Sequence, residues 1–148
     1  MSSSTALATP ASSGETQNGV VVHHHPNGNP CCESTFVDGV KEGPGKLYYR
    51  DYKGKVYAEE SWAGGKLKGP TTLYYPNGVI QAELPYKDDL LDGLAKEFFP
   101  TGKVSSEVHY AAGKRDGSTT VYDETGKKIC LEEYKGGVMI KAPVTPEE

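Results

Sequence analysis

Residues 69–78, GPTTLYYPNG, set the pattern of this chain, because the same pattern returns about every 24 residues. Within it, Leu73–Tyr75 are good strand formers, Pro76–Gly78 is a turn signal, and residues 79–86 alternate apolar with polar side chains. The Asn-Gly pair suits a two-residue type I′ turn, since both central residues of that turn need positive φ. Residues 69–92 are therefore predicted to form a β-hairpin.

Glycine recurs in three ladders that share this period. Steps within each ladder are 24 residues and rise to 26 only across residues 50–53, so one two-residue insertion explains every deviation. Asp89 fills the one gap in the third ladder. A period of about 20 to 50 residues indicates a repeat array, in which each unit buries apolar surface against its neighbours. The ladders are Gly19, Gly43, Gly69, Gly93 and Gly117; Gly28, Gly54, Gly78, Gly102 and Gly126; and Gly39, Gly65, Gly113 and Gly137.

Five repeats and two tails follow from these ladders. The first repeat is degenerate, because His24 and His25 stand where the third repeat carries Tyr74 and Tyr75. Residues 1–18 are predicted to be a disordered N-terminal tail and residues 141–148 a C-terminal tail. The repeats are predicted at residues 19–42, 43–68, 69–92, 93–116 and 117–140.

Period-two counting assigns the faces of each hairpin. If Asn77 and Gly78 form the loop, Tyr75 pairs with Ile80 and Leu73 with Ala82 on an apolar face, which leaves Tyr74 on the polar one. The counting also places Val56, Ala58, Ile80, Val104 and Val108 on the apolar face. We therefore expect an all-β fold, an elongated single-layer antiparallel meander of about five β-hairpin repeats. Pro85 in the middle of a strand conflicts with this pattern, and we expect a β-bulge there.

The segments WAGGKLKG (62–69) and YAAGKRDG (110–117) resemble the MORN repeat, whose signature joins an aromatic residue, a glycine three residues on, a basic residue and another glycine. The preceding YYPNG and a strand-borne glutamate are closer to the variant subfamily of MORN repeats common in bacteria. The outer copies depart from the pattern, as terminal caps would. The resemblance implies a solenoid of hairpins used mostly for protein association. It also implies two alternatives, since some variant members are antitoxins and phospholipid binding is proposed for the family.

A glutamate stands at the same strand position of four repeats, at Glu33, Glu59, Glu83 and Glu107. These residues should form a row with ~9–10 Å between successive members, too far apart for a shared-proton pair. Since no partner acid, histidine or nucleophile recurs beside them, we predict no enzyme, no catalytic residue and no cofactor. The row either pairs with neighbouring lysines and tyrosines or forms an acidic strip that docks a basic partner.

The candidate binding residues combine this row with the aromatic doublets of the first strands and with the inserted loop. Cross-strand packing is the plain interpretation of each aromatic residue, and recognition of a partner is the alternative. The candidates are Tyr48, Glu59, Tyr74, Glu83, Phe98, Glu107 and Tyr122, together with Asp51 and Tyr52 of the insertion.

His23–His25 with Cys31 and Cys32 place soft metal ligands across one hairpin. The spacing fits no zinc motif. Adjacent strand residues point to opposite faces, so only one cysteine and one or two histidines could converge. We therefore predict no metal site.

The net charge of −4 and the absence of any Lys or Arg before Lys41 exclude a nucleic-acid partner. No basic stripe supports membrane binding. Residues 1–18 lack the regions of a secretory signal, and three cysteines without framework spacing favour a reducing compartment, so we expect a cytoplasmic protein. We expect a non-enzymatic scaffold with a protein partner, or alternatively an antitoxin that masks a toxin, and thirdly a membrane-associated phospholipid-binding protein. The terminal strands of an open sheet also predict a homodimer.

Overall fold

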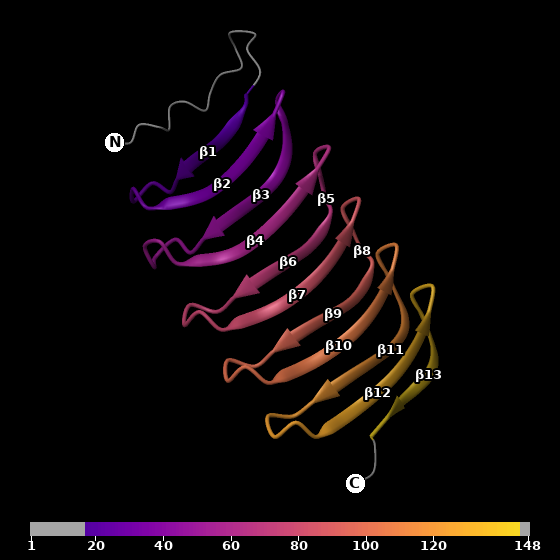
Figure 1. Ribbon diagram of the computed structural model, residues 1–148. Helices are drawn as coiled ribbons and strands as arrows, with labels where there is room; N and C mark the ends of the chain where they lie inside the picture. The colour runs from indigo at the N-terminus through magenta and orange to yellow at the C-terminus, as the bar shows by residue number, and fades with distance from the viewer. Residues whose placement is uncertain (1–16, 146–148) are drawn as a thin grey trace.

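The computed structural model describes residues 17–145, which form one antiparallel sheet without any helix (Figure 1). Accordingly, no helix in this part of the chain has the length and hydropathy needed to cross a membrane. The predicted all-β, single-sheet meander is confirmed. The strands are β1 (Gly19–His24), β2 (Pro30–Val37), β3 (Val40–Tyr48), β4 (Val56–Ala63), β5 (Lys66–Leu67), β6 (Gly69–Tyr74), β7 (Ile80–Lys87), β8 (Leu90–Leu91), β9 (Gly93–Phe98), β10 (Val104–Ala111), β11 (Lys114–Tyr122), β12 (Lys128–Lys135) and β13 (Val138–Val144).

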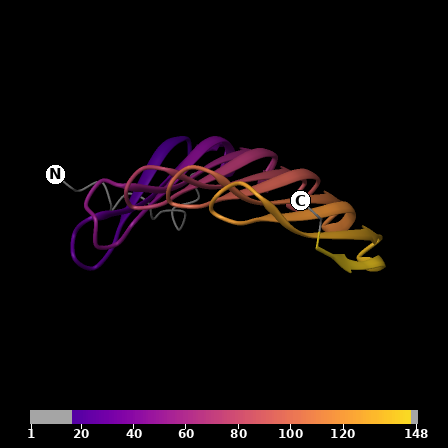
Figure 2. The same ribbon diagram turned by 90° about the horizontal axis from the view of Figure 1, so that it is seen from below.

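Apart from the short β5 and β8, each strand pairs with the next along the chain, so β1 and β13 are the two edges of the sheet. The short strands β5 and β8 pair with β4 and β7, just before β6 and β9 take over the same position. Figure 2 shows that the sheet is a single twisted and arched layer. Residues 1–16 of the predicted N-terminal tail lie outside the described residues. At the other end β13 continues to Val144, so the predicted C-terminal tail begins inside a strand.

The hairpin loops differ from the prediction in turn type. The amide of Gly78 donates to Tyr75 O and that of Tyr75 to Val79 O, both at 2.8 Å, which closes a three-residue loop. Gly78 has a φ of 88°, whereas Asn77 is not among the residues with positive φ. The predicted type I′ turn at Asn77 and Gly78 is therefore wrong. Pro76 locks its own φ near −65°, which suits the second position of a type I turn and leaves positive φ to Gly78.

Turns of the predicted type I′ kind lie at the other ends of the strands, on the side of the sheet opposite the three-residue loops (Figure 1). There the chain reverses over two residues, and both have positive φ, as at Gly64 and Gly65 with φ of 59° and 83°. Such turns match the right-handed twist of the strands that they join. The same conformation recurs at Asp38 and Gly39, Asp88 and Asp89, Ala112 and Gly113, and Gly136 and Gly137.

A β-bulge follows each three-residue loop and restores the alternation of faces. Tyr74 is opposite Ile80 while Leu73 is opposite Ala82, so Gln81 is the extra residue. The predicted pairing of Leu73 with Ala82 is confirmed, and that of Tyr75 with Ile80 is wrong. The three loop residues and the bulge residue make four, an even number. Beyond the bulge, side chains therefore point to the same faces as they would with a two-residue loop. Equivalent extra residues are Cys31, Tyr57, Ser105 and Ile129.

The two faces of the sheet carry different side chains. The core face carries Ala58, Ala82 and Ala95, which are 1%, 4% and 6% exposed, and the aromatic column Phe36, Trp62, Tyr86, Tyr110 and Tyr134. The glutamate face carries Glu33, Glu59, Glu83 and Glu107. No large side chain among the described residues is fully buried. The core is therefore a row of small side chains under larger neighbours, as expected of one layer without a second.

Carboxylates connect successive repeats along the side of the sheet that carries the type I′ turns. In three places an acidic side chain accepts a hydrogen bond from the first amide of the next turn. The second repeat has Lys68 at that position, and there the turn residue Asp89 accepts from Leu67 N at 2.7 Å instead. This reversal explains why Asp89 interrupts the glycine ladder. The three standard contacts join Gly64 N to Glu42 Oε1 (2.8 Å), Ala112 N to Asp92 Oδ1 (3.1 Å) and Gly136 N to Asp116 Oδ1 (3.0 Å).

Pro85 is tolerated because its neighbouring strand is interrupted there. The carbonyl of Pro85 accepts a hydrogen bond from Asp92 N at 2.9 Å, at the break between β8 and β9. A Cβ on Gly93 would lie 3.3 Å from the proline ring, so the two residues also pack closely. The irregularity expected at Pro85 is thus a break in the partner strand, and β7 itself continues without a bulge at that residue.

Candidate interaction surface

The predicted glutamate row exists and runs across the whole sheet. Its members lie on alternate strands, and residues of the intervening strands stand directly opposite them. Lys46 separates Glu33 from Glu59, and Lys96 separates Glu83 from Glu107. Four carboxylates and two ammonium groups therefore share the row, so its net negative charge is smaller than the predicted acidic strip requires. The full row reads Val22, Glu33, Lys46, Glu59, Thr72, Glu83, Lys96, Glu107, Thr120, Leu131 and Val144.

Tyrosine hydroxyls engage three of these carboxylates. In each case the tyrosine is the last residue of a first strand, and it donates to a glutamate on the neighbouring strand, fifteen residues earlier in the chain. The position is Phe98 in the fourth repeat, so Glu83 has no tyrosine donor there. Pairing with tyrosines, one of the two predicted interpretations, is thus confirmed for three glutamates. The bonds join Tyr48 to Glu33 (2.9 Å), Tyr74 to Glu59 (2.8 Å) and Tyr122 to Glu107 (2.8 Å).

The same contacts hold these phenols in their neutral form. Burial, followed by the hydrogen bond to Glu33, raises the pKa of Tyr48 to about 12. The hydrogen bond to Glu59, followed by burial, raises the pKa of Tyr74, and the bond to Glu107 raises that of Tyr122. A phenolate beside a carboxylate is disfavoured by like charge, so each hydroxyl remains a donor near neutral pH.

Replacing Phe98 by tyrosine is expected to supply the missing hydroxyl to Glu83 and to raise the free energy of unfolding by about 0.5–1.5 kcal/mol. Urea denaturation near pH 7 measures the gain, and Tyr74→Phe is the matched control, with a loss of similar size. A raised phenol pKa stabilises the fold below the pKa of the unfolded phenol, about 10. The gain should therefore disappear as the pH rises through the folded pKa. A Phe98→Tyr variant no more stable than the parent would contradict the bonding pattern.

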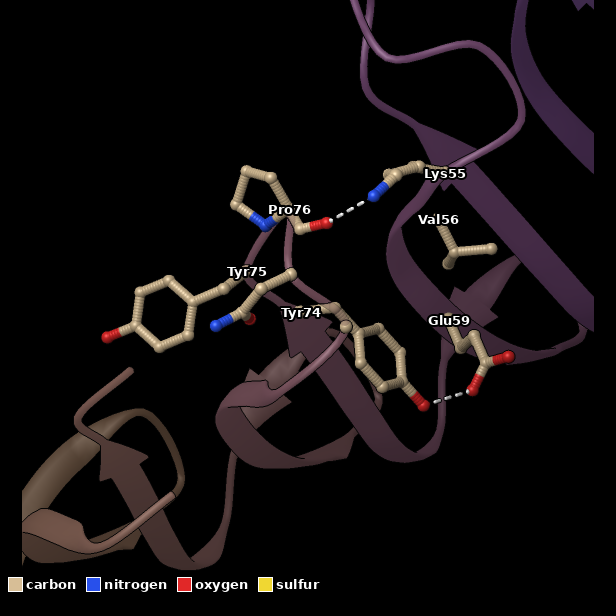
Figure 3. Close-up of a pocket in the computed structure, with 8 residues that line it drawn as sticks. Lys55, Val56, Glu59, Tyr74, Tyr75 and Pro76 are labelled. Atoms are coloured by element: carbon tan, nitrogen blue, oxygen red, sulfur yellow. Dashed lines mark hydrogen bonds between the residues drawn. The ribbon is translucent and has the colours of Figure 1, made fainter. Parts of the chain in front are cut away.

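A hollow of about 410 Å³ opens between the second and third repeats (Figure 3). Its lining includes Val56, Glu59 and Tyr74, and Lys55 Nζ donates to Pro76 O at 3.0 Å across its rim. Val56 therefore lies beside the glutamate row, not on the apolar face as predicted. The bulge at Tyr57 separates Val56 from the regular alternation that begins at Ala58, which accounts for this difference.

The inserted loop does not join the glutamate row. Asp51 is exposed at the loop, and Tyr52, which is 50% exposed, packs its ring against Tyr49 with 5.8 Å between centroids. Tyr49 also contacts Tyr57 at 5.3 Å, so three tyrosines gather at this corner. Side chains alternate along a strand, which places Tyr49 opposite in direction to Tyr48. The nine candidate residues thus divide into seven on the glutamate face, of which three glutamates belong to the row, and a separate loop pair.

The histidines and cysteines of the first hairpin do not lie as predicted. Cys31 is the extra residue of a bulge, so the two adjacent thiols do not alternate, and their Sγ atoms are 3.6 Å apart. Burial, then the hydrogen bond with Cys31, raises the pKa of the Cys32 thiol to about 11. Across residues 17–145, no group of three potential metal ligands comes together.

The core face contains two hollows that sequence reasoning missed. One, of about 850 Å³, extends toward the fifth repeat, and the other, of about 340 Å³, extends toward the third. Glu97, Phe99 and Ser105 line both. A signal was present in the sequence, because residues 97–99 read Glu-Phe-Phe where residues 47–49 and 73–75 read Leu-Tyr-Tyr.

Comparison with known families agrees with this architecture. Residues 67–88 and 91–112 match the family model of the MORN repeat variant, and residues 32–53 match that of the MORN repeat. A search of curated proteins found no match. The matched segments fall on neighbouring hairpins of one continuous sheet. The chain is therefore a repeat protein of stacked β-hairpins, and three segments of it match models of the MORN repeat or its variant.

Proposed function

We propose that this chain is a non-enzymatic scaffold that binds a protein partner along its sheet. The observation that carries the proposal is the single layer, because both faces of a long sheet are left open to partners. Rows of aromatic and charged side chains repeat across those faces at a constant spacing. Extended repeat surfaces of this kind suit association with other proteins.

The arrangement of the glutamates supports binding over catalysis. Three of them accept hydrogen bonds from tyrosines of high pKa, and the row places a lysine or threonine between successive carboxylates. General acid–base chemistry needs a titrating pair at a reacting atom. The same side chains can instead hold a basic partner by charge complementarity.

Crosslinking and capture from the native source test this function. The tagged protein is compared with two triple variants at Glu59, Glu83 and Glu107, one with lysine and one with glutamine. Glutamine retains an acceptor for the tyrosine hydroxyls and removes only the charge. We expect a partner whose binding weakens in both variants and becomes less dependent on salt.

Each outcome of this test has a separate meaning. Equal capture by all three proteins would remove the glutamate face as the docking surface. No specific partner would contradict the scaffold function itself. A captured toxin would favour the antitoxin alternative, and binding to anionic vesicles would favour the phospholipid alternative.

Self-association through the terminal strands is a second part of this proposal. The outer backbone of β13 lies at the edge of the sheet, and Val138 and Ile140 on that strand are 66% and 60% exposed. Exposed apolar edge strands are templates for strand addition. We expect the sedimentation mass to rise with concentration, and Ile140→Lys to prevent that rise. Val37→Lys, on an interior strand, is the control, and a parent that remains monomeric throughout would contradict the dimer.

A further inference from the structure

The fourth repeat departs from its neighbours at three consecutive residues. Residues 97–99 are Glu-Phe-Phe, whereas the second and third repeats carry Leu-Tyr-Tyr at 47–49 and 73–75. The fourth repeat is interior, so the departure is no terminal cap. Since the repeats share one fold, the neighbouring copies show what the structure alone requires at these positions.

The third residue of this triplet connects adjacent repeats when it is tyrosine. Tyr49 Oη donates to Tyr74 O and Tyr75 Oη donates to Phe98 O, both at 2.6 Å. Phe99 has no hydroxyl for the corresponding bond to the fifth repeat. The larger of the two core-face hollows lies at this same junction, with Phe99 in its lining. At this junction the apolar ring of Phe99 therefore lines a hollow, where the equivalent tyrosines form a hydrogen bond to the next repeat.

The first residue of the triplet places a carboxylate in an otherwise uncharged row. Glu97 is exposed on the core face, directly opposite Ala82 on one side and Ser106 on the other. Its contact with Ser106 Oγ is long, at 3.5 Å. Residues that stand directly opposite one another form this row, which reads His23, Cys32, Leu47, Ala58, Leu73, Ala82, Glu97, Ser106, Val121 and Cys130.

Two other charged groups of the larger hollow, Arg115 and Asp123, are already engaged. Arg115 donates to Tyr134 Oη at 2.9 Å and pairs with Glu132 at 3.5 Å. Asp123 Oδ1 accepts hydrogen bonds within its own loop, from Thr125 N at 2.8 Å and Thr125 Oγ1 at 2.6 Å. Glu97 and the exposed loop residue Glu124 are therefore the carboxylates of this hollow open to a new partner, and of the two only Glu97 also lines the second hollow. An apolar partner that covered it would leave a desolvated charge, whereas a cation would compensate it.

We propose that the core face of repeats three to five binds a segment of a partner protein that places a lysine or arginine on Glu97. The apolar neighbours of that cation pack on the two hollows, against Phe99 and Tyr75 on one side and Tyr110 on the other. This inference rests on the proposed scaffold function and specifies its partner chemistry. Its ligand is a mixed basic and apolar peptide.

The test selects binders from a random-peptide display library on the parent protein and on Glu97→Leu. Leucine is the residue of the second and third repeats at this position, so the variant should fold, which circular dichroism checks. Glu133→Gln removes one carboxylate outside both hollows and is the matched control. Parent and control should enrich Lys or Arg flanked by apolar residues, and Glu97→Leu should lose that preference.

A double-mutant cycle then isolates the contact. The best peptide from the parent should bind Glu97→Leu about tenfold more weakly or worse. Replacing its basic residue by methionine should weaken binding to the parent and leave binding to Glu97→Leu unchanged. Failure to select any sequence, selection without basic residues, or equal preferences in parent and variant would overturn the inference.

The scaffold function is tested separately by the partner from the native source. If that partner binds parent and Glu97→Leu equally, the scaffold function stands and the assignment of Glu97 fails. If no partner is captured while the peptide preference for Glu97 holds, the core-face site stands and the scaffold function fails.

Discussion

Replacing Gly117 by valine is expected to lower the free energy of unfolding by about 3 kcal/mol or more. Gly117 has a φ of 112°, which L side chains rarely adopt, and a Cβ there would lie 3.1 Å from His109 Cβ. The backbone strain contributes about 1–2 kcal/mol and the collision a similar amount, because the opposing atom belongs to a short, stiff part of its side chain. Urea denaturation measures the loss.

Gly126→Val is the matched control for this prediction. Gly126 also has positive φ, at 94°, but a Cβ there meets no atom within 4 Å. Its loss should be about 1–2 kcal/mol, from strain alone. Equal losses in the two variants would show that the close approach of strands at Gly117 does not matter. Hydrogen exchange adds a spatial readout, since amides of β11 and β12 should lose protection first.

Replacing Ala58 by aspartate is expected to lower the free energy of unfolding by more than about 3 kcal/mol. Ala58 is 1% exposed, and Leu47 and Leu73 stand directly opposite it on the two neighbouring strands. A carboxylate there meets apolar groups and loses its water without gaining a partner. The loss should shrink as the pH falls toward about 4, because the neutral acid is less costly to bury.

Ala111→Asp is the control, since Ala111 is an exposed alanine on a strand of the same sheet. Its effect should remain within about 1 kcal/mol. A comparable loss at both positions would mean that strand propensity, not burial, decides the effect. Because each repeat contacts only its neighbours, Ala58→Asp should also uncouple the second repeat from the third and broaden the transition.

Most of the architecture could be predicted because each repeat carries its own local instructions. Strand formers, turn residues and glycines at a constant spacing indicate hairpins without reference to any distant residue. The glutamate row was predictable for the same reason, since identical positions in identical units lie in line. The pairing of Tyr74 with the row also followed from counting along the strand.

The errors arose where one local signal competed with another. Asn77 and Gly78 favour a type I′ turn when taken alone, but Pro76 shifts the turn by one residue and a bulge at Gln81 compensates. The combined shift preserved the pairing of Leu73 with Ala82 and placed Ile80 opposite Tyr74 on the glutamate face. The bulge at Tyr57 moved Val56 to that face in the same way. Counting alone could not separate a two-residue loop from this combination, because both give the same parity beyond the bulge.

The chain alone therefore settled the hairpin period, the single sheet and the line of glutamates, all of which depend on contacts within a unit or between equivalent places. Only the assembled sheet decided which groups meet between units: the hydroxyl of Tyr75 on the carbonyl of Phe98, the carboxylate of Asp89 on the amide of Leu67, and the open hollows beside Glu97. These contacts join residues more than twenty positions apart or depend on the shape of two packed repeats. Their geometry exists only once neighbouring hairpins stack.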